Sequence, residues 1–542
     1  MTFLSRTVNF LSNSRYAPSI LSGVLLGLSF PSYPFIRLEV LAWVALVPLL
    51  LSLRFVEKPG DFFRRVYLSM LLFCLITLWW VSLATLPGGI LTIVSQAFFM
   101  TVPLFAFFLL KRVAGYRFAL FSFPFLWVAW EWSYMQQDLS LGWLTLGNSQ
   151  ANFNLMIQYA DLLGVWGISF WLLWFNVFVL LALIGSRKDV VVSVTAMVLM
   201  IVAPLLYASV VFHRYASHPG EGAGLRVTLV QPNIDPYEKW EGYNNNTMMN
   251  KYSRLTGRAV RENRPELVIW PETAIPFYIL DTMYAEELNS LRFSVRQWNT
   301  PLLTGFSDIV HYSSSLREEA GVGRKYDQLR KGSFETFNAS MLLLPGNGVP
   351  RIYRKMHLVP FAERVPYVEY FPFLGNATFS LAGISSWGKG RECAVMELHS
   401  SRHGSVKLAN IICYESIFPG FVTEFVRKGA QFLTLVTNDG WYSTSYGPYQ
   451  HLAIGRMRCI ENRRAMARCA NTGLTVVIDK FGRTIAEIPW WQESSLTAEV
   501  PLESQMTFYT IHPDLLPKVS VAVTVLLFLL AFSMKFKWER ER

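Results

Sequence analysis

Three residues of this 542-residue chain have side chains that could together perform nucleophilic catalysis. Cys413 closes an apolar, strand-like run, Glu272 follows another, and Lys355 stands between them in the sequence. A cysteine thiolate is a strong nucleophile, but a thiol is mostly protonated at neutral pH. It therefore needs a base, and a group that stabilises the oxyanion formed on attack. We predict that Glu272 is the base and that Lys355, helped by the backbone N–H of Tyr414, stabilises the oxyanion.

Each of these residues also has an ordinary structural explanation when it is taken alone. A buried strand cysteine is more often a packing residue than a nucleophile. Glu272 could be a loop carboxylate with a surface partner, and Lys355 could be a solvated surface residue. Two further carboxylates, Glu363 and Glu415, could orient the lysine or share its charge. The catalytic interpretation therefore depends on the sequence around all of these residues.

The composition indicates an integral membrane protein. Hydrophobic residues make up 52% of the chain, charged residues only 16%, and the mean hydropathy is +0.29. The net charge of +11 comes largely from short clusters beside apolar segments, so a nucleic-acid partner is not expected. The five cysteines include no C-x-x-C pair, and we expect neither a metal nor a cofactor.

Eight apolar segments have about the length needed to cross a bilayer, so the sequence predicts an α-helical polytopic membrane bundle. The first segment is interpreted as a retained anchor, because another span follows almost at once. The expected spans are 17–34, 38–55, 66–84, 89–110, 118–135, 165–185, 190–211 and 517–534.

The distribution of lysine and arginine predicts the orientation of these spans. With eight crossings the basic clusters fall on one side, whereas the loop 136–164 contains no lysine or arginine at all. Both termini are therefore expected in the cytoplasm, and the long segment between the last two spans on the other side. The predicted domains are 1–211 with seven spans, 212–516 as an extracytoplasmic domain, and 517–542 with the eighth span and a cytoplasmic tail.

The extracytoplasmic segment alternates strand-like and helix-like patterns, which is typical of a layered α/β domain. The stretch 312–332 is polar and is expected to be a surface loop. Expected strands are Leu225–Val230, Leu267–Trp270, Pro301–Gly305, Ala339–Leu344, Leu408–Cys413, Phe432–Thr437 and Thr475–Asp479, with helices near 246–263, 283–297, 419–429 and 448–465.

The sequence around the three candidate residues resembles the nitrilase superfamily, in the segments Leu267–Thr273, Tyr353–Glu363 and Ile411–Glu415. It is most similar to the membrane-bound apolipoprotein N-acyltransferase branch, and the ordered similarity covers nearly the whole chain. Further matching segments are Leu141–Trp143, Gly147–Gln150, Val230–Ile234, Lys239–Trp240, Thr437–Tyr442, Gly447–His451, Arg456–Arg458, Glu461–Arg464 and Ala470–Gly473. One departure is Ala362, where the family more often has glycine.

The resemblance implies an αββα sandwich, a role for each matching residue, and an activity. Implied catalytic residues are Glu272, Lys355 and Cys413; supporting residues are Glu363, Tyr414, Glu415 and Asn338; substrate-binding residues are Trp240, Trp441, Tyr442 and Phe373. The implied partners are a phospholipid acyl donor, phosphatidylethanolamine by the family pattern, and a diacylglyceryl-cysteine lipoprotein acceptor whose amino group receives the acyl chain from a cysteine thioester. The implied location is the bacterial inner membrane, with the catalytic domain on the periplasmic side.

Two other functions are compatible with parts of the sequence. A membrane-anchored amidase could use the same three residues, but one span would suffice to anchor it. A non-catalytic receptor for lipidated proteins would not need the complete Glu–Lys–Cys set. The aromatic-rich stretch 366–384 is expected to be either a buried loop or an apolar lid that touches acyl chains.

Overall fold

The computed structural model describes residues 14–217, 224–241, 244–312, 325–327, 332–346, 348–367, 370 and 387–540. The chain forms two compact units. The first contains residues 1–217, 449–457 and 512–542, and the second contains residues 218–448 and 458–511. The helix α15, Gly447–Asn462, thus contributes residues to both.

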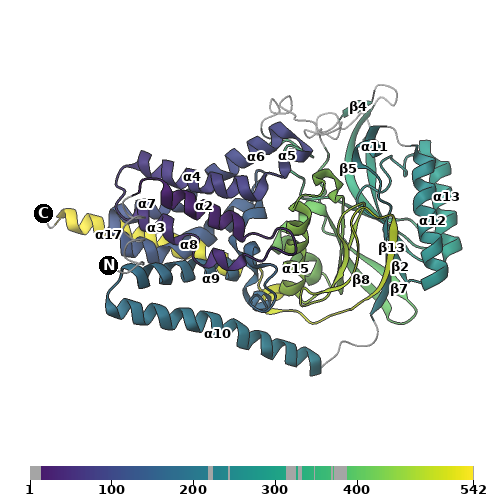
Figure 1. Ribbon diagram of the computed structural model, residues 1–542. Coiled ribbons are helices and arrows are strands. Elements are labelled where there is room, and N and C mark those ends of the chain that lie inside the picture. Colours follow the sequence, from purple (N-terminus) through teal and green to yellow (C-terminus); the bar gives the residue numbers. More distant parts are fainter. Residues whose placement is uncertain are drawn as a thin grey trace. The chain divides into compact units, whose positions relative to one another are not determined.

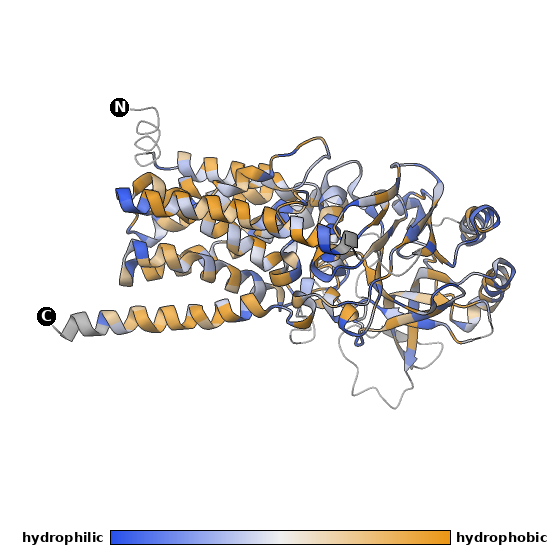
Figure 2. Ribbon diagram, turned by 90° about the horizontal axis from the view of Figure 1, so that it is seen from below, coloured by the Kyte–Doolittle hydropathy of each residue, from blue (hydrophilic) through white to orange (hydrophobic). Residues whose placement is uncertain are grey.

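The first unit is helical (Figure 1), and hydrophobic residues run along its helices (Figure 2). Its elements are α2 (Ala17–Ser29), η1 (Glu39–Trp43), α3 (Val47–Leu53), α4 (Pro59–Leu78), α5 (Val81–Ala84), α6 (Leu86–Phe99), α7 (Val102–Ala114), α8 (Tyr116–Met135), η2 (Gly142–Leu144), η3 (Leu146–Gln150), α9 (Ala160–Ile184), α10 (Arg187–Ser217) and α17 (Leu515–Arg540).

Among the described residues, four helical stretches are long and apolar enough to cross a membrane: Leu86–Ala114, Ala160–Ile184, Arg187–Arg214 and Leu515–Lys535. The expected span 89–110 is divided into α6 and α7 at Met100 and Thr101, next to Pro103, which cannot continue the hydrogen bonding of a helix. The expected span 38–55 consists of the short helices η1 and α3. The full set of eight crossings remains a prediction.

Several buried polar side chains inside the helical unit are hydrogen-bonded. Glu131 accepts hydrogen bonds from Trp127 Nε1 at 2.9 Å and from the Leu146 backbone N–H at 2.8 Å. Gln450 Oε1 accepts from the Trp143 indole at 2.7 Å and from the Trp80 indole at 3.2 Å. Such pairing is needed because an unsatisfied polar group costs several kcal/mol in an apolar surrounding.

The second unit contains two sheets. In the first, the strand order is β13-β1-β2-β3-β5-β4 with β6 on β5; in the second, it is β12-β11-β10-β9-β8-β7. The strands are β1 (Leu225–Gln231), β2 (Leu267–Ile269), β3 (Leu302–Tyr312), β4 (Lys325–Asp327), β5 (Gly332–Leu343), β6 (Arg351–Arg354), β7 (Val395–Ser400), β8 (Gly404–Ile412), β9 (Phe432–Thr437), β10 (Met466–Ala470), β11 (Thr475–Ile478), β12 (Thr484–Ile488) and β13 (Ser494–Val500).

Each sheet has a parallel centre, β1-β2-β3 in one and β8-β9-β10 in the other, so the carboxyl ends of these strands meet at one edge. The helices α12 (Asn245–Asn263) and α13 (Ala285–Trp298) pack on the first sheet through a shared apolar core (Figure 1). The sheets face each other where β1 packs on β10, and Cys469 contacts the carbonyls of Val230 and Ile269. The predicted layered α/β sandwich is confirmed.

None of the five cysteines, all of which lie within the described residues, forms a disulfide. Cys74 is buried in α4. No group of three or more histidine, cysteine or acidic side chains that could hold a metal ion is found within the described part of the chain.

Candidate active site

Cys413 lies one residue beyond β8 and begins a short 3-10 helix, η7 (Cys413–Ile417). Its φ of 49° is in the left-handed region, which costs a non-glycine residue about 1 kcal/mol. The turn is held from both sides, because the Ser416 hydroxyl donates to the Cys413 carbonyl at 2.9 Å and the Ile412 N–H donates to Glu415 Oε2 at 2.9 Å. The strand end therefore presents the thiol in one fixed direction.

Glu415 connects this turn to the segment that carries the candidate lysine. Its buried carboxylate accepts hydrogen bonds from the Tyr353 hydroxyl and the Met356 N–H, both at 2.6 Å. Burial raises the pKa of Glu415 to about 7, although its hydrogen-bond donors act in the opposite direction. Because the same carboxylate also holds Ile412, it fixes the distance between the Cys413 turn and the Lys355 segment.

Glu415→Gln should therefore reduce both stability and activity. A glutamine presents an NH₂ group where one carboxylate oxygen now accepts N–H groups, so at least one buried donor loses its partner, at a cost of about 1–3 kcal/mol. The measurement is the thermal unfolding midpoint of the full-length protein together with its transferase rate. Tyr353→Phe is the matched control, since it removes only one donor and should cost less. Equal unfolding midpoints for Glu415→Gln and the wild type would contradict this role.

Glu272 lies in a tight loop after β2. Thr273 adopts a left-handed φ of 45°, and the loop passes directly over Gly305 in β3. A Cβ at Gly305 would lie 2.5 Å from the Thr273 nitrogen and 2.8 Å from the Glu272 Cα, so only glycine leaves room for this loop. Glu272 is buried, with 7% of its surface exposed.

Lys355 follows β6 and lies between two carboxylates. Its Nζ donates to Glu272 Oε1 at 3.1 Å and to Glu363 Oε1 at 2.9 Å. The amide of Asn338 donates to the same two oxygens, at 2.8 and 3.1 Å. The Val359 N–H holds the other oxygen of Glu363 at 2.8 Å. The structure thus brings together Glu272, Lys355, Glu363 and Asn338 in one buried cluster.

The electrostatics of the cluster determine the protonation of the thiol and of the lysine. Burial raises the pKa of the Cys413 thiol and the Glu272 carboxylate raises it further, whereas Lys355 and a hydrogen bond from Thr437 at 3.4 Å lower it. Burial disfavours the Lys355 ammonium, but the two carboxylates outweigh it and hold the pKa of Lys355 well above its ordinary value. The resting site therefore contains a neutral thiol beside an ammonium.

The predicted substrate-binding residues are described only in part. Tyr442 lies in electrostatic range of Cys413 and Glu272, and burial raises the pKa of its hydroxyl. Trp441 packs edge-on against Tyr237, with ring centroids 5.2 Å apart. The side chain of Trp240, the residue Phe373 and nearly all of the 366–384 stretch lie outside the described residues, as does most of 312–332. Tyr414 is buried and its ring packs against Phe418 at 5.5 Å.

Three residues at the site were not predicted from the sequence: Lys239, Gly305 and Thr437 as a partner of the thiol. Lys239 is buried and donates to the Glu272 loop. Lys239 belongs to a segment that matches the family, but a lysine in a sequence gives no sign that its side chain is buried. Gly305 ends an expected strand, and only the close approach of the Glu272 loop explains it.

Comparison with known proteins identifies the family. A model of the carbon-nitrogen hydrolase family matches residues 226–506, and a model of the apolipoprotein N-acyltransferase N-terminal domain matches residues 22–178. An apolipoprotein N-acyltransferase of Chlorobaculum tepidum is 57% identical over 96% of this chain and 97% of its own length. The chain belongs to the apolipoprotein N-acyltransferase family.

Another member of the family and two solved structures are more distant. An apolipoprotein N-acyltransferase of Geobacter metallireducens is 32% identical over 96% of both chains. An amidase from a Nesterenkonia species is 15% identical with a TM-score of 0.34, covering 53% of this chain and 95% of its own. A nitrilase-superfamily protein of Saccharomyces cerevisiae is 17% identical with a TM-score of 0.35, covering 56% and 95%.

Proposed function

We propose that this protein transfers an acyl chain from a phospholipid to the amino group of a diacylglyceryl-cysteine lipoprotein, through a thioester on Cys413. The observation that carries the proposal is the buried cluster in which the Lys355 ammonium bridges Glu272 and Glu363 within electrostatic range of the neutral thiol. The cluster supplies a nucleophile, a base and a cation, and the family supplies the class of transfer. A small-amide hydrolase is disfavoured, because both the helical and the catalytic part match the transferase family.

In the first half-reaction the Cys413 sulfur attacks an ester carbonyl of the phospholipid. Because the pKa of the thiol is raised, its proton must leave as the carbon–sulfur bond forms, and Glu272 accepts it. The resulting oxyanion is stabilised by Lys355 and the N–H of Tyr414. When the carbon–oxygen bond breaks, Glu272 returns the proton to the leaving alkoxide. The products are a lyso-phospholipid and the acyl thioester.

In the second half-reaction the amino group of the lipoprotein attacks the thioester carbonyl. Glu272 takes a proton from the nitrogen, and the tetrahedral intermediate collapses with release of the sulfur, which recovers the proton from Glu272. Glu363 and Asn338 keep the lysine in place through both steps, since Glu363 accepts a hydrogen bond from it and Asn338 donates to both carboxylates that bind it. Burial of the cluster limits the access of water, which would otherwise hydrolyse the thioester.

This scheme predicts ping-pong kinetics. Two bulky lipid substrates share one nucleophile, so the lyso-lipid should leave before the acceptor binds. The measurement is steady-state kinetics with both substrates varied, together with mass spectrometry of protein incubated with donor alone. Parallel double-reciprocal lines and the mass of one acyl chain on Cys413 are expected with phosphatidylethanolamine as donor. Intersecting lines without any added mass would exclude the thioester route.

The location that we propose is the inner membrane, with both termini in the cytoplasm and the sandwich unit on the periplasmic side. The charge distribution supports it. Cysteines introduced at Ser314 and Arg540 should react with a membrane-impermeant reagent from opposite sides of the membrane. Labelling of both positions from the same side would overturn the orientation.

A further inference from the structure

Lys239 is a second buried lysine beside the candidate base. It lies in the short helix α11 (Pro236–Glu241), and only 3% of its surface is exposed. Its Nζ donates to the Thr273 hydroxyl at 3.1 Å and to the Glu272 carbonyl at 3.3 Å. A buried ammonium is costly unless it is paired or hydrogen-bonded, because burial favours the uncharged form.

The two acceptors of Lys239 belong to the strained part of the Glu272 loop. Thr273 has a left-handed φ of 45°, and Gly305 supports the loop from the sheet so closely that no Cβ would fit there. Strain of this kind persists only where the surrounding structure fixes it. Lys239 is the side chain that binds this loop from α11, so the loop is held between the sheet and the lysine.

The charge of Lys239 is coupled to the carboxylate that it helps to hold. Burial lowers the pKa of Lys239 to about 7, and the Glu272 carboxylate acts in the opposite direction. Asp235 and Glu238, beside it and within α11, are exposed, and Lys355 faces the same carboxylate from β6. The Lys239 ammonium is therefore present below about pH 7 and is lost as the pH rises above that value.

We propose that Lys239 is a positioning residue for the acyl transfer, which fixes the loop that carries Glu272. The proposal rests on the proposed role of Glu272. It also gives the Lys239–Trp240 motif a physical meaning, because Lys239 connects α11 to the loop that carries the base.

The test is the variant Lys239→Met, assayed in the full-length protein by thioester formation from labelled phospholipid between pH 5.5 and 9, a range chosen to bracket the lysine's titration near pH 7. We expect the rate to fall roughly 10- to 100-fold, as for other small misplacements of a catalytic group. We also expect the wild-type rate to fall as the pH rises above about 7, because the ammonium that holds the loop is lost, and we expect Lys239→Met to lack this fall. Lys251→Met is the control, since Lys251 pairs with Glu493 at 3.1 Å outside the cluster.

Two further variants separate the possible outcomes. Thr273→Val keeps the shape of the side chain but removes one acceptor of Lys239, and should give a smaller loss in a folded protein even if Lys239→Met does not fold. The positioning role would be overturned if Lys239→Met showed the same fall in rate above pH 7 as the wild type. If only Thr273→Val folds, a wild-type rate in that variant would overturn it. If Glu272→Gln itself keeps the wild-type rate, the proposed function fails instead.

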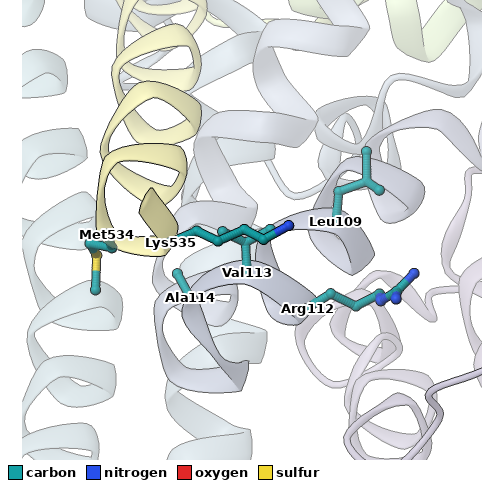
Figure 3. A pocket seen from close by; sticks show the side chains of 6 residues that line it. All are labelled: Leu109, Arg112, Val113, Ala114, Met534 and Lys535. Atoms are coloured by element: carbon teal, nitrogen blue, oxygen red, sulfur yellow. The ribbon is translucent and has the colours of Figure 1, made fainter. Parts of the chain in front are cut away.

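A separate pocket of about 630 Å³ lies in the helical unit, between the ends of α7 and α17 (Figure 3). Arg112 and Lys535 supply its cationic groups, and their charged ends point to the same side in Figure 3. The remaining lining is apolar: Leu109, Val113, Ala114 and Met534. Two of the apolar spans end here, at Ala114 and at Lys535, so the pocket lies where hydrocarbon gives way to headgroups.

Two neighbouring basic residues, Lys111 and Arg117, have partners outside this pocket. Lys111 turns inward to the carbonyls of Leu53 and Val56, at 3.0 and 2.7 Å. Arg117 is paired with Asp189 at 2.8 Å. Arg112 instead lies over the Phe108 ring, 5.8 Å from its centroid, with its charge at the pocket. The geometry points to a site for the phosphate of an anionic phospholipid, whose acyl chains would contact the apolar lining.

The test compares thermal unfolding of the delipidated protein in phosphatidylcholine nanodiscs with and without phosphatidylglycerol. We expect phosphatidylglycerol to raise the unfolding midpoint of the wild type. The double variant Arg112→Gln, Lys535→Gln should lose this shift, and Arg117→Gln should keep it. An unchanged shift in the double variant, or none in the wild type, would overturn the site. An equal shift with inorganic phosphate alone would overturn its assignment to a lipid.

Discussion

Cys413→Ala should abolish acyl transfer while leaving a folded protein. Removing the nucleophile of a covalent mechanism costs on the order of 10⁴- to 10⁶-fold in rate, because the other residues of the site cannot act without it. Cys413→Ser should also be inactive, since the cluster holds a neutral thiol and a hydroxyl is far harder to deprotonate. The measurement is transfer from labelled phospholipid, with label retained on the denatured protein as a direct readout of the thioester.

Cys393→Ala is the matched control for this experiment. Cys393 is a buried cysteine of the sandwich unit, and its backbone carbonyl accepts a hydrogen bond from Lys428 at 2.8 Å. The control should keep both the rate and the label. More than a small residual rate in Cys413→Ala would mean that another group forms the bond to the acyl chain.

Lys355→Met should also cause a large loss of activity. It removes an oxyanion donor, which alone costs about 10²–10³ in rate. It also leaves Glu272 and Glu363 side by side without the ammonium that now bridges them at 3.1 and 2.9 Å. The two carboxylates lie close together, because both accept a hydrogen bond from the Asn338 amide. Two negative charges so close cannot both remain ionised, so a proton is expected to bind the pair and to block the base. Thioester formation should therefore fall by more than the loss of one donor explains.

The companion variant Glu272→Gln separates the two contributions. It keeps the lysine but cannot accept the thiol proton, so the thioester should not form. Lys480→Met is the control for the loss of a partly buried ion pair, since Lys480 pairs with Glu503 at 3.0 Å elsewhere in the unit. Normal thioester formation in either cluster variant would remove that residue from the mechanism.

Hydrophobic patterning predicted most of the central strands but missed the central strand β10 and the edge strand β13. β9 has the predicted bounds, and β1 and β11 differ by one residue at an end. β10 was missed because Arg468 interrupts its apolar pattern; in the structure that side chain is fully buried and donates to both oxygens of Asp439 at 2.8 Å. β13 was missed because its residues are mostly half-buried and small or polar, and it is recognisable only by its pairing with β1.

The site shows the same division between local and tertiary information. Glu272, Lys355 and Glu363 were predicted from their segments, and the structure brings them into contact. Nothing in the sequence shows that Glu415 would hold three segments at once, or that Lys239 would be buried against the Glu272 loop. Such contacts join residues that are far apart along the chain, and only the packed sheets bring them together.

The protonated state of Cys413 also affects how the protein tolerates an oxidising environment. Oxidation, disulfide exchange and alkylation all proceed through the thiolate. Burial raises the pKa of the thiol at Cys393, Cys413 and Cys469, so these cysteines react slowly with oxidants. In the proposed mechanism, the nucleophile becomes reactive only when Glu272 takes its proton during attack on a bound carbonyl. We therefore expect the thiol of the free enzyme to persist under oxidising conditions without a reductant.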